Sequence, residues 1–180
     1  KSRNHCYDDI INWHNHSDFG FGSSYYTSLT VAQRIINFTF FFVFFSDDIG
    51  SSQDEKEVLK AIINRDLLFL KNFNTLHYKE KNNFVFCEIL AFVITDKLVN
   101  KKKSEENLLK ILDFEMRNQV SGDGSTKEGS LGYDKFILEC LFLAWLLGAT
   151  ENKSIILNLF NKLYELSNTE SKMPGIGDVS

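Results

Sequence analysis

Apolar residues recur along most of the chain at the i, i+3, i+4, i+7 spacing of helices, and no long stretch alternates as a strand would. The pattern predicts five or six helices, with candidates over residues 26–45, 52–72, 84–99, 104–119, 125–147 and from 150 onward. Some of them are apolar nearly all round, and others have one apolar face. This alternation of inner and outer helices is typical of stacked antiparallel hairpins. We therefore expect an all-α fold whose helical hairpins form part of an incomplete α/α toroid.

Capping residues mark where two of these helices begin. Ser52 and Glu55 have the spacing of a capping box, in which the serine hydroxyl and the glutamate carboxylate bind backbone amides at the helix start. Ser125 and Glu128 repeat this spacing. We therefore expect the fifth helix to begin at residue 125.

Length and charge limit the class of protein. A chain of 180 residues fits one domain, here a partial one over residues 1–180, with a polar N-terminal segment at 1–14 and the start of a missing downstream region at 173–180. The 20 Lys and Arg against 24 Asp and Glu give a net charge of −4, which argues against nucleic acid as a partner. The longest apolar runs, 38–45 and 137–147, are shorter than the roughly 20 residues of a membrane span.

The spacing of cysteine and histidine predicts no disulfide framework, no metal site and no cofactor. The three cysteines are an odd number and widely spaced, and two of them lie in apolar helical runs where a thiol behaves as a small hydrophobe. His5, His14 and His16 lie together near the start, but no cysteine or acidic ligand accompanies them in a zinc-binding pattern.

Three charged residues, Arg34, Glu88 and Glu139, lie in helices that are otherwise apolar. A buried charge needs a partner, so we interpret them first as pairing with one another. A functional role is the alternative.

The segment 119–133 is rich in glycine and carries the first candidate for chemistry. Its glycines allow a tight turn and the close approach of a ligand to the start of a helix, where Tyr133 would be favoured as a phenolate by the positive helix end. Asn82 and Asn83 precede another helix, where an amide could donate to a substrate oxygen. Alternatively, these residues only cap helices, and Tyr133 packs into the core with its hydroxyl satisfied.

Five short motifs resemble, in order and spacing, those of the heparinase II/III-like proteins, a group of polysaccharide lyases that includes alginate lyases. The resemblance runs from about residue 15 to residue 180. The motifs are Gly20-Phe-Gly-Ser-Ser24 with Leu29-Thr-Val-Ala-Gln-Arg-Ile-Ile-Asn-Phe38, Asn83-Phe-Val-Phe-Cys-Glu88, Gln119 with Asp123-Gly124, Glu128-Gly-Ser130 with Tyr133 and Glu139, and Pro174-Gly-Ile-Gly-Asp178.

The resemblance implies β-elimination of a uronic-acid-containing acidic polysaccharide or oligosaccharide. By that resemblance Asn83 neutralises the substrate carboxylate, and Tyr133 removes the adjacent proton and then protonates the leaving oxygen. Arg34, Glu128 and Asn82 would bind the substrate. The family also implies that β-sandwich material follows the toroid, and that the protein is exported to the bacterial periplasm or secreted.

Three positions depart from the family pattern. Phe84 stands where the family has a histidine, and its side chain can neither donate a hydrogen bond nor carry a proton. Thr30 replaces a glutamate, and Asp134 replaces the histidine after the tyrosine. Because further catalytic groups of the family lie in the missing downstream domain, we expect these 180 residues alone to be inactive.

Two other functions remain open. A glycan-binding or processing protein could keep the toroid without the elimination chemistry, and Trp13, Tyr25 and Tyr26 would then stack on sugar faces. The other is a helical interaction scaffold that binds no sugar.

Overall fold

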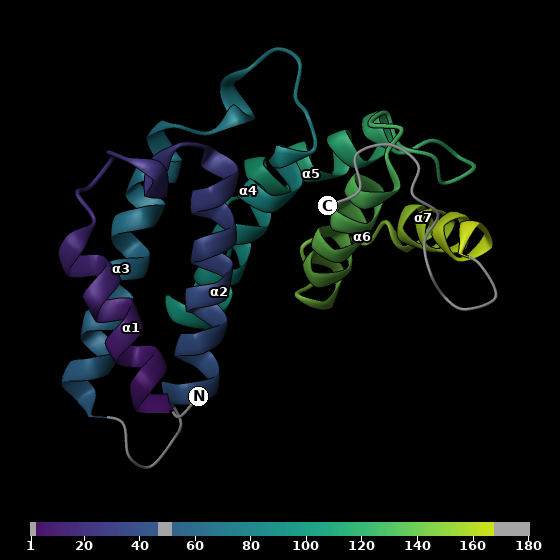
Figure 1. Cartoon of the computed structure of the whole chain (residues 1–180). Helices are drawn as coiled ribbons and strands as arrows, with labels where there is room; N and C mark the ends of the chain where they lie inside the picture. The colour runs from purple at the N-terminus through teal and green to yellow at the C-terminus, as the bar shows by residue number, and fades with distance from the viewer. Residues whose placement is uncertain (1–2, 47–51, 168–180) are drawn as a thin grey trace.

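The structure, a computed structural model, describes residues 3–46 and 52–167 and is built from helices (Figure 1). The α-helices are α1 (Arg3–His16), α2 (Ser28–Ser46), α3 (Gln53–Asn72), α4 (Phe84–Ile94), α5 (Glu106–Gln119), α6 (Leu131–Leu146) and α7 (Lys153–Leu166). Short 3-10 turns are η1 (Ser23–Tyr25) and η2 (Thr75–His77), and a π-helical turn, η3 (Thr95–Val99), continues α4. The expected all-α class is confirmed, since the two described ranges contain no strand beyond one isolated bridge.

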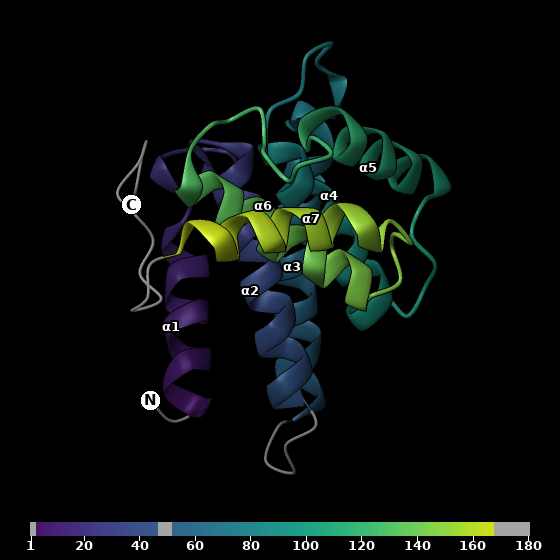
Figure 2. The same cartoon turned by 90° about the vertical axis from the view of Figure 1, so that its right-hand side faces the viewer.

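The helices pair as hairpins whose first members form an inner row. In sequence order α2 packs on α3, α4 on α5 and α6 on α7, while α2 contacts α4 and α4 contacts α6. Figure 1 shows α4 between the α1–α3 group and the α6–α7 pair, and in Figure 2 α7 crosses in front of the inner row. As the apolar pattern predicted, α4 is almost wholly buried, with Phe86, Ile89 and Leu90 at most 1% exposed.

Helix α1 was not predicted, because its sequence is polar and its apolar residues are few. The helix packs through Ile10 against Leu59 and Ile62 of α3, with Tyr7 and Trp13 beside them. Tyr7, Ile10 and Trp13 are spaced by three residues, so successive turns of α1 each place one apolar side chain in this contact. These three side chains are too few to stand out from the surrounding polar residues.

The two expected capping boxes have different outcomes. At Ser52 the box is confirmed: its Oγ accepts from the Glu55 amide at 3.2 Å, and the Glu55 carboxylate accepts from the Ser52 amide at 2.8 Å. At residue 125 the prediction is wrong, because α6 begins at Leu131. The Ser125 hydroxyl instead donates to Asp123 at 2.8 Å, which closes a tight turn before the helix.

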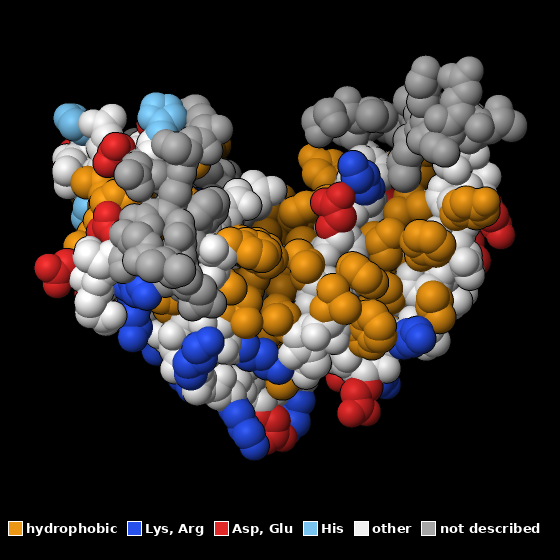
Figure 3. Space-filling view, turned by 90° about the horizontal axis from the view of Figure 1, so that it is seen from below, with side chains coloured by type: hydrophobic (Ala, Val, Ile, Leu, Met, Phe, Trp, Pro, Cys, Tyr) orange, Lys and Arg blue, Asp and Glu red, His pale blue; other side chains and the backbone are white. Residues whose placement is uncertain are grey.

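Apolar side chains stay exposed on the outer sides of α6 and α7. Phe142, Leu146 and Phe160 are 46%, 59% and 51% exposed. A groove of about 280 Å³ runs between the two helices, and Trp145 and Leu157 help to line it. Figure 3 shows hydrophobic side chains gathered over the middle of the molecule and over the side that α6 and α7 form.

Neither a membrane-spanning helix nor a metal cluster is found within residues 3–46 and 52–167. None of the helices there is long and apolar enough to cross a bilayer. Nor do these ranges bring together three or more histidine, cysteine or acidic side chains that could hold a metal ion.

Candidate functional site

Arg34 of α2 is held by an acidic partner from α3. Its Nε donates to Asp66 Oδ2 at 2.7 Å, and its Nη1 donates to the Ser24 carbonyl at 2.7 Å. Asp66 is fully buried and also accepts from the Tyr25 hydroxyl at 2.7 Å. Arg34 is therefore a tightly bound residue between α2 and α3, and its partner was missed because Asp66 lies in a helix rich in exposed charges.

The expected pairing of Arg34 with Glu88 or Glu139 is wrong. Glu88 is fully buried, and its carboxylate accepts from the amide of Thr75 at 3.0 Å and from its hydroxyl at 2.7 Å. Glu139 is exposed, with 62% of its side chain accessible and Lys135 at 3.8 Å. Helix α6, which carries Glu139, thus keeps one face open to solvent. Glu88 of α4 instead anchors the loop that follows α3.

The three aromatic residues expected to stack on sugars lie in different surroundings. The Trp13 ring packs against the guanidinium groups of Arg34 and Arg65, at 4.5 and 5.3 Å from its centroid. Tyr25 is only 6% exposed, and its burial together with the hydrogen bond to Asp66 raises its pKa to about 12. Trp13 and Tyr25 thus support the cluster around Arg34, whereas Tyr26 is 85% exposed and presents its ring to solvent.

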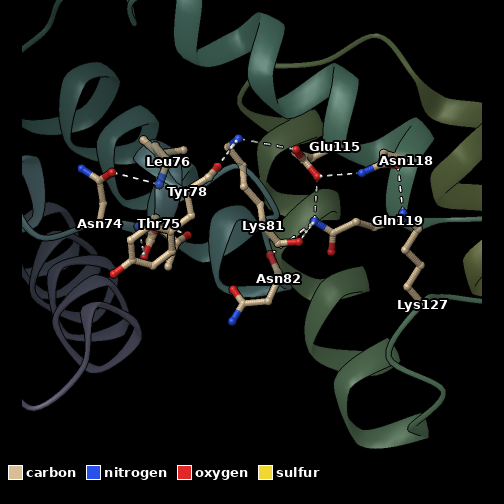
Figure 4. Close-up of polar contacts among 11 residues, drawn as sticks. Asn74, Thr75, Leu76, Tyr78, Lys81, Asn82, Glu115, Asn118, Gln119 and Lys127 are labelled. Carbon is tan, nitrogen blue, oxygen red and sulfur yellow. Dashed lines mark hydrogen bonds and ion pairs between the residues drawn. The ribbon is translucent and has the colours of Figure 1, made fainter.

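The loop before α4 is fastened to α5 through Gln119 (Figure 4). The Gln119 Nε2 donates to the carbonyls of Lys81 and Asn82 at 3.4 and 3.3 Å, and to Glu115 Oε2 at 2.9 Å. The buried Glu115 carboxylate lies 3.9 Å from the Lys81 ammonium. Gln119 belongs to one of the five motifs, but its anchoring role could not be predicted from that motif.

Asn83 stands at the N-terminal end of α4 and meets the loop that precedes α6. Its backbone amide donates to Glu128 Oε1 at 3.3 Å. Asn83 is 3% exposed, and its side-chain amide makes no hydrogen bond with any described residue. Asn82 is exposed, and its Oδ1 accepts from the Phe84 amide at 3.1 Å. The structure therefore brings Asn82, Asn83 and Glu128 together, and it buries the Asn83 side chain.

The loop over residues 121–130 is a compact turn that leads into α6. Gly124 has a φ of 84°, and an added Cβ would lie 2.1 Å from the Asn158 carbonyl oxygen of α7. The Thr126 hydroxyl donates to Asp134 in the first turn of α6. Burial is the largest influence on the Asp134 carboxyl and raises its pKa. The loop is thus fixed at both ends, by glycine packing and by this hydrogen bond.

Tyr133 lies in the first turn of α6, whereas the expected helix start at residue 125 would place it about two turns into the helix. It is 36% exposed, and its hydroxyl makes no hydrogen bond within the described ranges. Helix α4 packs on α6, and Glu128, in the loop before α6, binds the backbone amide of Asn83 at the start of α4. No described hydrogen bond or ion pair joins Arg34 to this group.

Cavities elsewhere are lined by other residues. A cavity of about 520 Å³ lies between α3, α4 and α5, with His77 and Asp96 in its wall and neither Asn83 nor Tyr133. The remaining motif, residues 174–178, lies outside the described residues.

Comparison with known proteins gives one fold likeness. No model of a known protein family matches the sequence, and no curated protein matches it. A crystal structure of heparinase III matches 98% of this chain with a TM-score of 0.70 and 19% sequence identity. The chain spans 29% of the length of that heparinase III chain. The likeness shows that this chain has the helical fold of heparinase III, and the expected hairpins of an incomplete α/α toroid are confirmed.

Proposed function

We propose that this chain is the toroid part of a polysaccharide lyase-like protein that cleaves uronic-acid-containing acidic polysaccharides by β-elimination. The observation that carries the proposal is the placement of Asn83 and Tyr133. They lie at the N-terminal ends of two packed helices, and neither side chain has a hydrogen-bond partner among the described residues. The heparinase III-like fold and the motif resemblance support the same chemistry.

The first chemical requirement is to acidify the proton next to the uronate carboxylate. The negative charge on that carboxylate opposes removal of the proton, so a donor must stabilise the charge that develops as the proton leaves. The Asn83 amide is such a donor, and the N-terminal end of α4 adds the partial positive charge of the helix dipole. Glu128 fixes the Asn83 backbone through its amide and so sets the direction of the side chain.

The second requirement is a group that removes the proton and later returns one. In this proposal the Tyr133 phenolate takes the proton from the carbon next to the carboxylate. The C–H electrons form the C=C bond, and the C–O bond to the leaving sugar breaks. The phenol formed then gives its proton to the leaving oxygen, which restores the phenolate. Tyr133 suits this part because its side chain is partly exposed and its hydroxyl makes no hydrogen bond with the described residues.

Arg34 takes a different part from the one the motif suggested. Its guanidinium is bound by Asp66 and by the Ser24 carbonyl, and 12% of its side chain is accessible. We assign Arg34 to holding α2 and α3 in position. Tyr26, which is close to Arg34 in sequence and 85% exposed, is assigned to contact with the glycan.

A second candidate function is glycan binding without cleavage. Phe84 favours it, because it stands beside Asn83 where the family pattern has a histidine and supplies no proton. The test for both is ultraviolet absorbance of unsaturated uronate, with the intact protein and a panel of alginate, heparan sulfate and hyaluronan. A rising signal on one glycan supports the lyase. Binding without absorbance supports the second function, and absence of both refutes a glycan role.

A further inference from the structure

Two of the three cysteines meet at the contact between α4 and α6. Cys87 of α4 is 1% exposed and Cys140 of α6 is 5% exposed, and the two helices pack on each other. All three thiols are free, and Cys6 lies on α1, away from this contact.

The two buried thiols line the same cavity. Side-chain hydrogen bonding with Cys87 is the main reason that the pKa of Cys140 is well above its ordinary value, and burial and the Glu139 carboxylate raise it further. A thiol held in its protonated form reacts slowly with external reagents. Once one of the pair has reacted, the other is a second thiol in the wall of the same cavity.

The pair can be reached from the surface. Both cysteines line one cavity of about 390 Å³, together with Phe136 and Glu139. Gln33 and Asn37 of α2 complete its outer wall, and these two residues and Glu139 are exposed. The cavity thus gives a small disulfide reagent a route to the buried sulfurs.

We propose that Cys87 and Cys140 form a disulfide that links α4 to α6 when the protein meets a small-molecule disulfide as oxidant. One cysteine thiolate attacks the reagent and releases one reagent thiol. The second cysteine thiolate then displaces the other reagent thiol, and the Cys87–Cys140 bond forms. Two protein thiols are oxidised, one reagent disulfide is reduced to two thiols, and the two protons end on those thiols.

The cross-link would hold together the two helices whose N-terminal ends carry Asn83 and Tyr133. A disulfide that closes the long loop between residues 87 and 140 restricts the unfolded chain, so the oxidised protein is expected to resist urea better than the reduced protein. The bond requires the sulfurs to approach to about 2.0 Å. This inference does not depend on the proposed function.

The test uses the whole chain, oxidised glutathione under native conditions, and acid quenching with alkylation of the remaining thiols. The expected result is a loss of two of the three free thiols, a mass lower by two hydrogen atoms, and a digest peptide that joins Cys87 to Cys140. Cys6→Ala should leave that peptide unchanged. Cys87→Ala should abolish it while Cys140 remains alkylated or carries glutathione.

Two results would overturn the proposal. One is that all three cysteines of the native protein remain alkylated after oxidation. The other is that the linked peptide appears only when the chain is oxidised in urea, which would show that native packing keeps the two sulfurs apart.

Discussion

The contact between Arg34 and Asp66 offers a test of how the toroid part is held together. Asp66 is fully buried and 12% of the Arg34 side chain is accessible, so Asp66→Ala would leave a nearly buried guanidinium without its carboxylate. Breaking a buried pair in this way costs about 3–5 kcal/mol of the free energy of unfolding. With a urea slope of about 2 kcal/mol per molar, the unfolding midpoint should fall by about 2 M.

The cause can be separated from a general packing loss by a double-mutant cycle. The combination of Asp66→Leu with Arg34→Met removes both charges together. A Tyr25→Phe background removes the hydroxyl that also donates a hydrogen bond to Asp66. The double variant should cost less than the sum of the single variants, by about 2 kcal/mol, because neither charge is then left alone.

Urea unfolding followed by circular dichroism measures each variant. Glu139→Ala is the matched control, since its carboxylate is exposed and 3.8 Å from Lys135. An exposed pair of this kind contributes less than about 0.5 kcal/mol. If Asp66→Ala shifted the midpoint no more than Glu139→Ala does, or if the cycle were additive, the assignment of Arg34 as a structural residue would be refuted.

Two further predictions concern the loop before α6 and the alkaline limit of stability. Gly124→Ala should cost more than about 2 kcal/mol in the same unfolding assay, because its φ of 84° and the Asn158 oxygen 2.1 Å from a new Cβ both oppose a side chain. Gly122→Ala, with open space around it, is the control, and equal costs would contradict the reasoning. The pKa of Tyr25 is raised from 10.0 to about 12, so its contribution is complete below pH 10 and is lost as the pH rises towards 12. Tyr25→Phe should therefore lose stability less steeply than the wild type across that range, and parallel curves would show that Tyr25 titrates normally.

Much of the fold follows from periodicity, since burial of one helix face leaves a clear pattern in the sequence. The bounds of α3 were predicted to within a residue, because Ser52 and Glu55 form a real capping box. The same spacing of Ser125 and Glu128 predicted a helix start at residue 125 that the structure does not have. There Asp123 competes for the Ser125 hydroxyl and Glu128 binds the amide of Asn83, a residue distant in sequence.

The polar partners were harder to predict than the helices. Arg34, Glu88 and Glu139 looked alike in the sequence, yet one binds a buried aspartate, one binds a loop and one faces solvent. Which of these occurs depends on which side of each helix meets a neighbour, and periodicity does not fix that for helices that are apolar nearly all round.

The central claim is that Tyr133 carries the elimination chemistry, and one pair of variants tests it most directly. Tyr133→Phe removes a hydroxyl with no described hydrogen bond, so its urea midpoint should equal that of the wild type. Tyr164→Phe on α7, where the residue is 73% exposed, is the matched control. On the glycan that the intact protein cleaves, we predict that Tyr133→Phe forms no unsaturated uronate while Tyr164→Phe retains wild-type turnover. Unchanged turnover in folded Tyr133→Phe protein would contradict the account.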